Sequence, residues 1–343
     1  MRQRSVNSFL VMAALACGLM LVAAGGVMAA QDIKVPVAGP MYPEASEGLG
    51  LNMYFSALES RVASHPDLKG KFNYKLLDKG TLFGTQDECV SGVASGAAQL
   101  TYAGTHFLEA FAPEWKLVQS PGFFENWTHF RKTMDTPAWK GLHEKMAKEK
   151  GLTIVKWMAN IGSWFLYTNK GPIKTAADVK GQKIRIAGGE GFAKALAAMG
   201  AASISLPYTE VVTALQTNMI NGLLTDMLGA IYFYNLPRYT KHVVPVTWAI
   251  QPICLVVNTK WWESLDPKAR TAMQDVFDRI DVANFYDGLE GMLVQKWGAG
   301  PETKVNQLDQ AEAERWKATM TEAAKSVAAG IDPKFIEAIK ASK

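Results

Sequence analysis

The sequence predicts an α/β protein built from two lobes, and three observations lead to that class. Strand-like and helix-like patterns alternate along the chain, which is typical of α/β lobes with mainly parallel strand pairing. About 313 residues follow an apolar leader, which is more than one typical domain contains. A helical pattern of about 30 residues then begins at Asp266, and its length of about 45 Å would allow it to brace both lobes at once.

The N-terminal stretch has the composition of a secretory signal peptide. Arg2 and Arg4 precede an almost unbroken apolar segment from Phe9 to Ala24, and small residues follow it. We therefore expect cleavage just before Ala30, export of the mature chain and a periplasmic location. A membrane anchor is the alternative, but it needs about 20 continuous apolar residues, and glycine interrupts this segment.

Net charge and cysteine content narrow the possible partners. The whole chain has 36 Lys and Arg against 32 Asp and Glu. Such a small excess, scattered along the sequence, does not indicate nucleic acid or a membrane surface as a partner. Only Cys89 and Cys254 follow the leader. An oxidising compartment permits a bridge between them, and two buried free thiols are the alternative that we favour.

The first half of the mature chain alternates between strands and helices. A face containing Leu51 and Tyr54 predicts a helix over residues 47–64. Thr85 and Glu88 form a capping box that opens a helix ending near residue 98. The apolar patterns predict strands over residues 32–37, 71–77, 98–102, 152–158 and 164–168.

The alternation continues in the second half. Thr175 and Asp178 form a second capping box. Asn221 and Gly222 together make a good helix stop signal. The patterns predict strands over residues 183–186 and 203–206 and a helix from Thr209 to about Asn221.

No low-complexity linker separates these patterns, so we expect lobes that are joined by several crossing strands. Asp266 followed by Pro267 marks the start of the long helix. We expect a signal peptide at residues 1–29, lobe I at 30–158 and 243–265, lobe II at 159–242, and the long bracing helix with the C-terminal helices at 266–343.

The sequence contains no recognisable catalytic or cofactor motif. Its five histidines lack metal-ligand spacing, and neither a nucleophile elbow nor a phosphate-binding loop is present. Gly189 and Gly191 lie between a strand and a helix, but a dinucleotide fingerprint needs a third glycine where Lys194 stands. We therefore expect no cofactor, no metal and no enzymatic activity. An exported enzyme with a nucleotide at this turn is the alternative, and a helix start that faces an anion is another use for the glycines.

Arg185, at the end of a buried strand, is the main candidate for a ligand contact. An exported two-lobed chain without reactive groups has the profile of a protein that closes a cleft over a small solute. Arginine offers a carboxylate a planar, permanently charged pair of donors. A surface ion pair with Asp or Glu is the alternative role for this side chain.

Residues 166–226 contain a pattern that is specific in combination. It comprises Asn169-Lys170-Gly171-Pro172-Ile173, then Asp178-Val179-Lys180-Gly181-Gln182-Lys183-Ile184-Arg185, Gly200-Ala201, Pro207, Glu210-Val211 and Ala214-Leu215-Gln216. This pattern resembles that of the solute-binding subunits of TRAP transporters, the tripartite ATP-independent periplasmic systems of the DctP family. Similar segments at residues 80–104, 120–135 and 256–265 extend the resemblance over nearly the whole mature chain.

The resemblance implies a protein that binds a small organic acid, a carboxylate, in a cleft between two lobes. Such subunits pass the acid to membrane-embedded permease subunits that are driven by an ion gradient rather than by ATP. The family's arginine clamps the carboxylate, and that role falls on Arg185. The binding protein of an ATP-driven transporter, or the ligand-binding subunit of a sensor, is the alternative with a similar cleft.

The chain departs from the family pattern where the ligand is selected. Residues 221–226 replace the aspartate-glycine-glutamine-glutamate-asparagine-proline of many members, and Trp164 stands near a common second arginine or polar group. A dicarboxylate needs a second cation or several donors. We therefore expect an aromatic or apolar monocarboxylate, with Trp164 as a wall of the cleft; core packing is the alternative for Trp164.

Five further residues are candidates for ligand contact. Tyr42 and Glu44 lie in the first strand-to-helix loop, which faces a cleft in such an architecture. Tyr208 and Asp226 flank the predicted helix over residues 209–220, and Trp248 lies near a crossing strand. The alternatives are a solvated loop carboxylate for Glu44, packing for Tyr208, a turn cap for Asp226 and core packing, which we favour, for Trp248.

Overall fold

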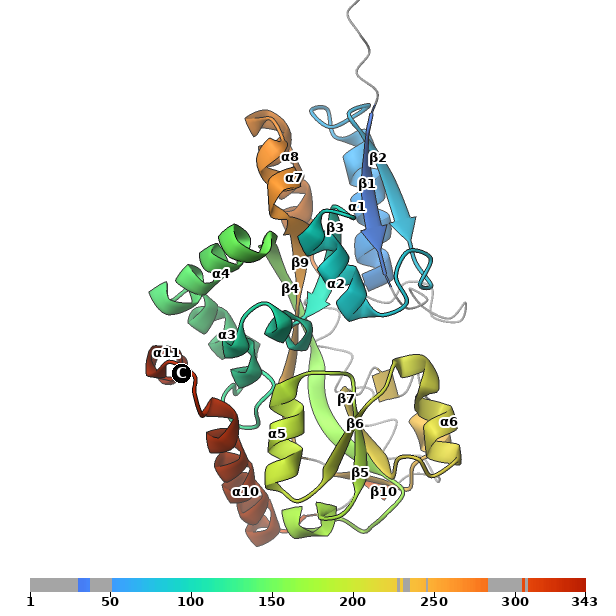
Figure 1. Ribbon diagram of the computed structural model, residues 1–343, viewed down its shortest axis with the longest axis vertical. Helices are drawn as coiled ribbons and strands as arrows, with labels where there is room; N and C mark the ends of the chain where they lie inside the picture. Colours follow the sequence, from blue (N-terminus) through green and yellow to red (C-terminus); the bar gives the residue numbers. More distant parts are fainter. Residues whose placement is uncertain are drawn as a thin grey trace, which may run out of the picture.

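The computed structural model describes residues 30–37, 51–226, 229–230, 235–244, 246–282, 304–305 and 308–343. Figure 1 shows two lobes, one containing the N-terminal strands and the other containing the strands of the middle of the chain. Long strands run between the lobes, and the C-terminal helices lie along one side of both. The architecture is therefore α/β, as the sequence predicts.

The first lobe begins with two strands that pair in parallel along their full length, β1 (Gln31–Pro36) and β2 (Phe72–Leu77). Helix α1 (Leu51–Ser64) follows β1 in the described part of the chain, and its Tyr54 is completely buried in the core of this lobe. These bounds confirm both predicted strands and the predicted helix over its described residues.

The capping box at Thr85 is present and opens α2 (Gln86–Ser95). The backbone N–H of Glu88 donates to Thr85 Oγ1 over 3.4 Å, and the N–H of Thr85 donates to Glu88 Oε2 over 3.1 Å. The helix ends at Gly96, whose φ of 88° is left-handed, rather than near residue 98. Strand β3 (Leu100–Gly104) follows.

Four elements of the first lobe pack around a core of aromatic side chains. Trp115 lies edge-to-face with Trp139 at a ring-centroid distance of 5.1 Å, and both side chains are buried. These elements are η2 (Thr105–Ala110), η3 (Pro113–Leu117), α3 (Trp127–Met134) and α4 (Pro137–Lys150). The helices α7 (Thr259–Ser264) and α8 (Pro267–Arg279) contribute instead to the core that contains Tyr54.

One strand, β4 (Leu152–Thr168), joins the two lobes. Its first part pairs antiparallel with β9 (Ile250–Asn258), and its last part pairs antiparallel with β7 (Gly222–Asp226) and β8 (His242–Val244). The prediction of two separate strands here is wrong. The pairing of β4 with β9 shifts register three times, and such bulges break the apolar alternation without ending the strand.

The second lobe contains a mixed sheet with the strand order β10-β8-β4-β7-β5-β6. Pairs β5–β6, β5–β7 and β8–β10 are parallel, while β4 is antiparallel to its neighbours, so the expected mainly parallel pairing is wrong for β4. The predicted helix after Thr209 ends early, because Asn218 turns the chain with a φ of 57°. The new elements are β5 (Lys183–Ile186), α5 (Glu190–Ala198), β6 (Ala202–Ser205), η5 (Tyr208–Glu210), α6 (Val211–Gln216), η7 (Leu236–Arg238) and β10 (Lys304–Val305).

The long helix expected from Asp266 is wrong in its length. The predicted start is confirmed, since the N–H of Ala269 donates to Asp266 Oδ1 over 2.9 Å. The helix then ends at Arg279, and Ile280 has an extended backbone with a φ of −94° and a ψ of 100°. Residues 283–303 of the expected helical region lie outside the described residues.

The bracing role belongs instead to α10 (Gln310–Ala328) and α11 (Pro333–Ala341). Helix α10 packs against α5 of the second lobe and η3 of the first, and α11 packs against α3 and α4. His129 of α3 forms a hydrogen bond of 2.7 Å through Nε2 with the carbonyl of Ile339. The C-terminal helices therefore contact both lobes (Figure 1).

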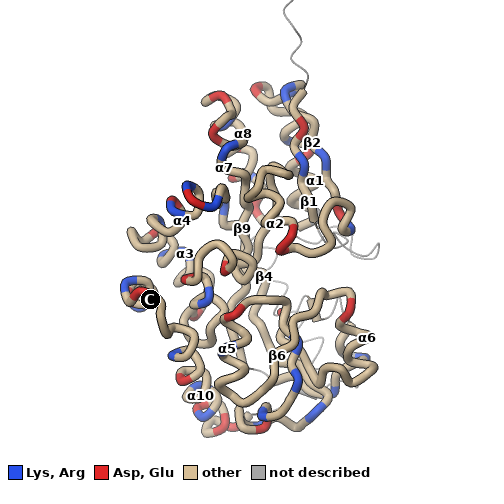
Figure 2. Tube along the Cα trace, viewed as in Figure 1, with Lys and Arg blue, Asp and Glu red and all other residues tan. Residues whose placement is uncertain are grey.

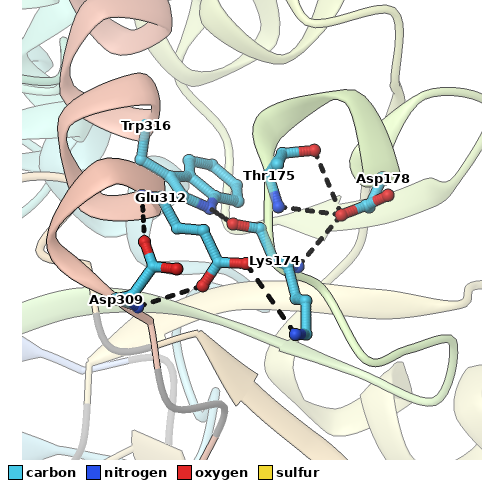
Figure 3. A network of polar contacts seen from close by, with 6 residues as sticks. All are labelled: Lys174, Thr175, Asp178, Asp309, Glu312 and Trp316. Carbon is cyan, nitrogen blue, oxygen red and sulfur yellow. Dashed lines mark hydrogen bonds and ion pairs between the residues drawn. The ribbon is translucent and has the colours of Figure 1, made fainter.

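Figure 3 shows how the start of α10 is held on the second lobe. Trp316 Nε1 donates to the carbonyl of Lys174 over 3.0 Å, and Lys174 Nζ lies 3.8 Å from Glu312 Oε1. The predicted capping box of Thr175 and Asp178 is present on η4 (Ala176–Val179), directly beside this contact.

Two further findings concern the cysteines and the search for membrane-spanning helices. Cys89 and Cys254 are both free and buried, and burial raises the pKa of the Cys89 thiol to about 12. None of the described helices is both long and apolar enough to cross a membrane.

Candidate functional site

A cavity of about 380 Å³ lies where the two lobes meet, within the size range of small-molecule sites. The first lobe contributes Thr85, Tyr102 and His106 to its wall, and the second contributes Arg185 and Asp226. Its apolar wall includes Phe107, Ile161, Trp164 and Leu206. The cavity therefore combines a polar side and an apolar side.

Arg185 is the charged centre of this cavity. It lies on β5 between β6 and β7, opposite Ile204 on one side and Leu223 on the other. Its side chain is only 2% exposed, and its Nε donates to the carbonyl of Leu206 over 3.0 Å. This bond fixes the guanidinium in the cavity wall. The side chain is therefore held more rigidly than it would be on a surface loop.

Beside Arg185 lies a chain of three hydrogen-bonded side chains. Trp164 Nε1 donates to Gln251 Oε1 over 2.6 Å, and Gln251 Nε2 lies 3.2 Å from His106 Nδ1. Burial, together with the charge of Arg185, lowers the pKa of His106 to about 3. The imidazole is therefore neutral at physiological pH.

The structure brings four of the seven candidate residues together. Trp164, Arg185, Tyr208 and Asp226 line the cavity. Trp248 does not line it; its side chain is 1% exposed and packs in the core of the second lobe, which is the alternative that the sequence favoured. The remaining two candidates, Tyr42 and Glu44, lie outside the described residues.

Sequence reasoning missed His106 and Gln251. His106 comes directly after β3, so the rule that binding residues follow strand ends would have found it. Gln251 is a buried polar residue in the mainly apolar strand β9, and its burial demands a partner. Both signals are visible in the sequence, but neither indicates that the two side chains meet.

The glycine-rich turn after Arg185 serves a contact between the lobes. Glu109 of η2 accepts hydrogen bonds from the backbone N–H groups of Glu190 at 2.6 Å and of Gly191 at 3.2 Å, at the start of α5. A Cβ on Gly191 would lie 2.8 Å from the carbonyl oxygen of Lys116, and Gly189 has a φ of 90°. The group that faces this helix start is therefore the carboxyl group of Glu109, from the same chain.

A pH-dependent stability follows from Glu109. Burial raises the pKa of Glu109 to about 7, although the two backbone N–H groups act in the opposite direction. Between about pH 4.5 and about pH 7 the native state holds a proton that the unfolded chain has lost. We expect the free energy of unfolding to fall across this window by at most about 3 kcal/mol as pH rises.

The matched variant for this prediction is Glu109→Gln, which keeps an oxygen that accepts both N–H groups but does not titrate. Urea unfolding at several pH values would compare it with the original chain. We expect the difference in stability between the two proteins to change between pH 4.5 and pH 7 and to be constant above that window. A constant difference throughout would contradict the raised pKa.

Charges are interspersed over both lobes, as Figure 2 shows. The cavity contains few charged side chains. Among the described residues that line it, Arg185 is the one Lys or Arg, while Asp87 and Asp226 contribute carboxylates. Among the described residues, no group of three His, Cys, Asp or Glu side chains is arranged to hold a metal ion.

Comparison with known proteins decides the family. A family model described as "Bacterial extracellular solute-binding protein, family 7" (DctP) matches residues 56–330. The chain belongs to this family. The resemblance found in the sequence is thereby confirmed.

Two relatives show how similar this chain is to curated proteins. The 2,3-diketo-L-gulonate-binding periplasmic protein YiaO of Escherichia coli (strain K12) is 28% identical over 211 residues, which are 60% of this chain and 61% of the relative. The C4-dicarboxylate-binding periplasmic protein DctP of Rhodobacter capsulatus is 23% identical over 316 residues, which are 91% of this chain and 92% of the relative. The first match thus spans less than two thirds of the relative's length.

A solved structure extends the comparison to the fold of family 7. The crystal structure of a TRAP periplasmic solute-binding protein from Shewanella oneidensis, with bound succinate, matches with a TM-score of 0.80 at 19% identity. The match covers 92% of this chain and 99% of that one. The predicted two-lobed fold is therefore confirmed.

Proposed function

We propose that this protein is an extracytoplasmic solute-binding protein that captures a small organic acid and delivers it to the membrane subunits of a TRAP transporter. The observation that carries the proposal is the buried Arg185 in the wall of a cavity between two lobes. A buried guanidinium is a natural partner for a carboxylate. The relatives support this class, because one is named for a diketo sugar acid and the Shewanella structure contains succinate.

The ligand is a monocarboxylate with an apolar or aromatic body. Two carboxylates on one ligand are best matched by two cations, and the described lining residues include a single cation, Arg185, together with the carboxylates of Asp87 and Asp226. In the same cavity, Trp164, Phe107 and Ile161 provide a surface suited to an apolar body. The named dicarboxylate ligands of relatives therefore do not transfer directly to this chain.

Two lobes close over the acid, the first containing β1, β2 and β3 and the second containing β5, β6 and β7, while α10 and α11 brace them. Cleavage of the signal peptide before Ala30 and a periplasmic location go with this role. The protein holds its ligand without converting it, and it needs no cofactor. The family supports the binding role, because the matching model describes solute-binding proteins.

A thermal-shift panel tests the proposal. It contains benzoate, phenylacetate, 3-methylbutanoate, succinate and glucuronate, the amides of the first three acids, and ATP and NAD. A ligand at 100 times its Kd stabilises the native state by about 2.7 kcal/mol, so a binding carboxylate raises the melting temperature while its amide does not. Stabilisation by a nucleotide alone would overturn the proposal in favour of an exported enzyme, and a larger effect of succinate would overturn the monocarboxylate assignment.

A further inference from the structure

We propose that His106 is a second ligand contact, a neutral imidazole whose Nε2–H donates to the same carboxylate that Arg185 binds. This inference rests on the proposed function and deepens it, because it specifies the donors that surround the carboxylate. The inference follows from which atoms donate and which accept in the hydrogen bonds around His106.

The donor roles in this chain of side chains follow from tryptophan. An indole Nε1–H only donates, so the atom of Gln251 that lies 2.6 Å away must be the amide oxygen. The amide nitrogen of Gln251 therefore faces His106 and donates to Nδ1 over 3.2 Å. Since Nδ1 accepts, the single proton of the neutral ring must be on Nε2.

The surroundings keep this arrangement in place. Asn160 Oδ1 accepts from the backbone N–H of Gln251 over 2.8 Å, which fixes the residue that orients the imidazole. The ring of Trp164 stands edge-on to His106 at a centroid distance of 5.7 Å, and the ring of Phe192 lies 6.4 Å away. The imidazole has little freedom to rotate and exchange its two nitrogens.

Gly104 supplies the space for the pair. A Cβ at this position would lie 2.7 Å from His106 Cε1 and 2.8 Å from Gln251 Nε2. The φ of Gly104 is −73°, which any residue adopts, so its backbone conformation does not require glycine. The space that His106 and Gln251 occupy is the reason for glycine here.

The charge balance explains why the imidazole is neutral. A second cation buried beside Arg185 would be repelled and desolvated, and both effects favour the uncharged ring. A neutral N–H still donates to a carboxylate, whose two oxygens offer about four lone-pair sites. Arg185 and His106 then both offer donors to the carboxylate, so a carboxamide, which would have to direct its own N–H₂ group at one of these two donors, binds more weakly.

The experiment measures binding of the strongest carboxylate of the thermal-shift panel, and of its amide, by calorimetry on the whole mature chain. His106→Phe keeps a planar ring without a donor and is expected to weaken carboxylate binding by about 10-fold to 100-fold. His106→Gln, whose amide nitrogen reaches the position of Nε2, is expected to recover most of that loss. Gly104→Ala is expected to weaken binding although it removes no donor, because its Cβ displaces His106 and Gln251.

A spectroscopic measurement distinguishes a ligand contact from a packing role. In protein labelled with ¹⁵N-histidine, we expect His106 as the Nε2–H tautomer without ligand, and a shift of its Nε2–H resonance when the carboxylate is added but not when the amide is added. An Nδ1–H tautomer, or equal carboxylate affinity in the original chain and in His106→Phe, would overturn this inference alone. If no carboxylate of the panel binds to the original chain, the proposed function is overturned and this inference with it.

Discussion

Replacing Arg185 with alanine is expected to weaken carboxylate binding by about 2–5 kcal/mol, on the order of 30-fold to several thousand-fold. The side chain is 2% exposed and its Nε is already bonded to the carbonyl of Leu206, so it is held ready before the ligand arrives. A preformed donor pair contributes more than a flexible one, because little side-chain entropy is lost on binding. Calorimetry with the strongest carboxylate of the panel would measure the change.

Three control variants separate binding from folding in this experiment. Lys183→Ala removes a cation from the exposed end of the same strand and should leave affinity unchanged. Arg185→Lys keeps the charge without the planar fork and should give an intermediate loss. Arg185→Met keeps most of the volume, so unfolding of all three Arg185 variants in the absence of ligand would show any structural cost. Full affinity in Arg185→Ala would disprove the clamp.

Local signals in the sequence were sufficient for the parts of this fold that depend on neighbours in the chain. The capping boxes at Thr85 and Thr175 appear where the side-chain spacing predicted them. Arg185 lines the cavity, as expected from its place at the end of a buried strand together with the family pattern around it. These features involve residues within a few positions of one another.

Features that depend on distant partners were missed. The register shifts of β4 are set by its pairing with β9, about 100 residues later, so the alternation in the sequence looked like two strands. His106 and Gln251 are 145 positions apart, and their hydrogen bond cannot be read from either segment. Helix α8 ends at Arg279 although apolar spacing continues, and Lys156 Nζ donates to the carbonyls of Phe277 and Ile280 at that end, over 2.7 Å and 2.6 Å.

At the glycine turn after Arg185, the sequence left open a helix start that faces an acidic group, but it did not indicate which group. The sequence allowed an anion at this helix start, and the group found there is the carboxyl of Glu109, 81 positions before Glu190. Glu190 itself forms ion pairs with Lys116 of the first lobe and with Lys194 of its own helix. The turn thus joins the lobes near the cavity, where a nucleotide phosphate would have to displace a carboxylate.

Replacing Trp248 with alanine is expected to lower the free energy of unfolding by about 3–5 kcal/mol and to leave carboxylate affinity unchanged. Trp248 is 1% exposed in the core of the second lobe and does not line the cavity. No atom of the described residues accepts a hydrogen bond from its Nε1. Trp248→Phe should therefore cost much less than Trp248→Ala, because it removes a buried donor without a partner.

Trp164 is the matched comparison, since it is almost as buried, at 2%, and lies on the strand beside Trp248. The N–H of Trp248 donates to the carbonyl of Trp164 over 2.8 Å, so the two residues share one backbone environment. Only Trp164 donates its indole N–H, to Gln251 Oε1. Trp164→Phe leaves that oxygen without its donor and frees the amide of Gln251 to turn, which removes the constraint on His106. We therefore expect Trp164→Phe to weaken carboxylate binding and Trp248→Phe not to, as measured by calorimetry alongside urea unfolding. Equal affinity in the two phenylalanine variants would show that the hydrogen bond from Trp164 to Gln251 does not affect carboxylate binding.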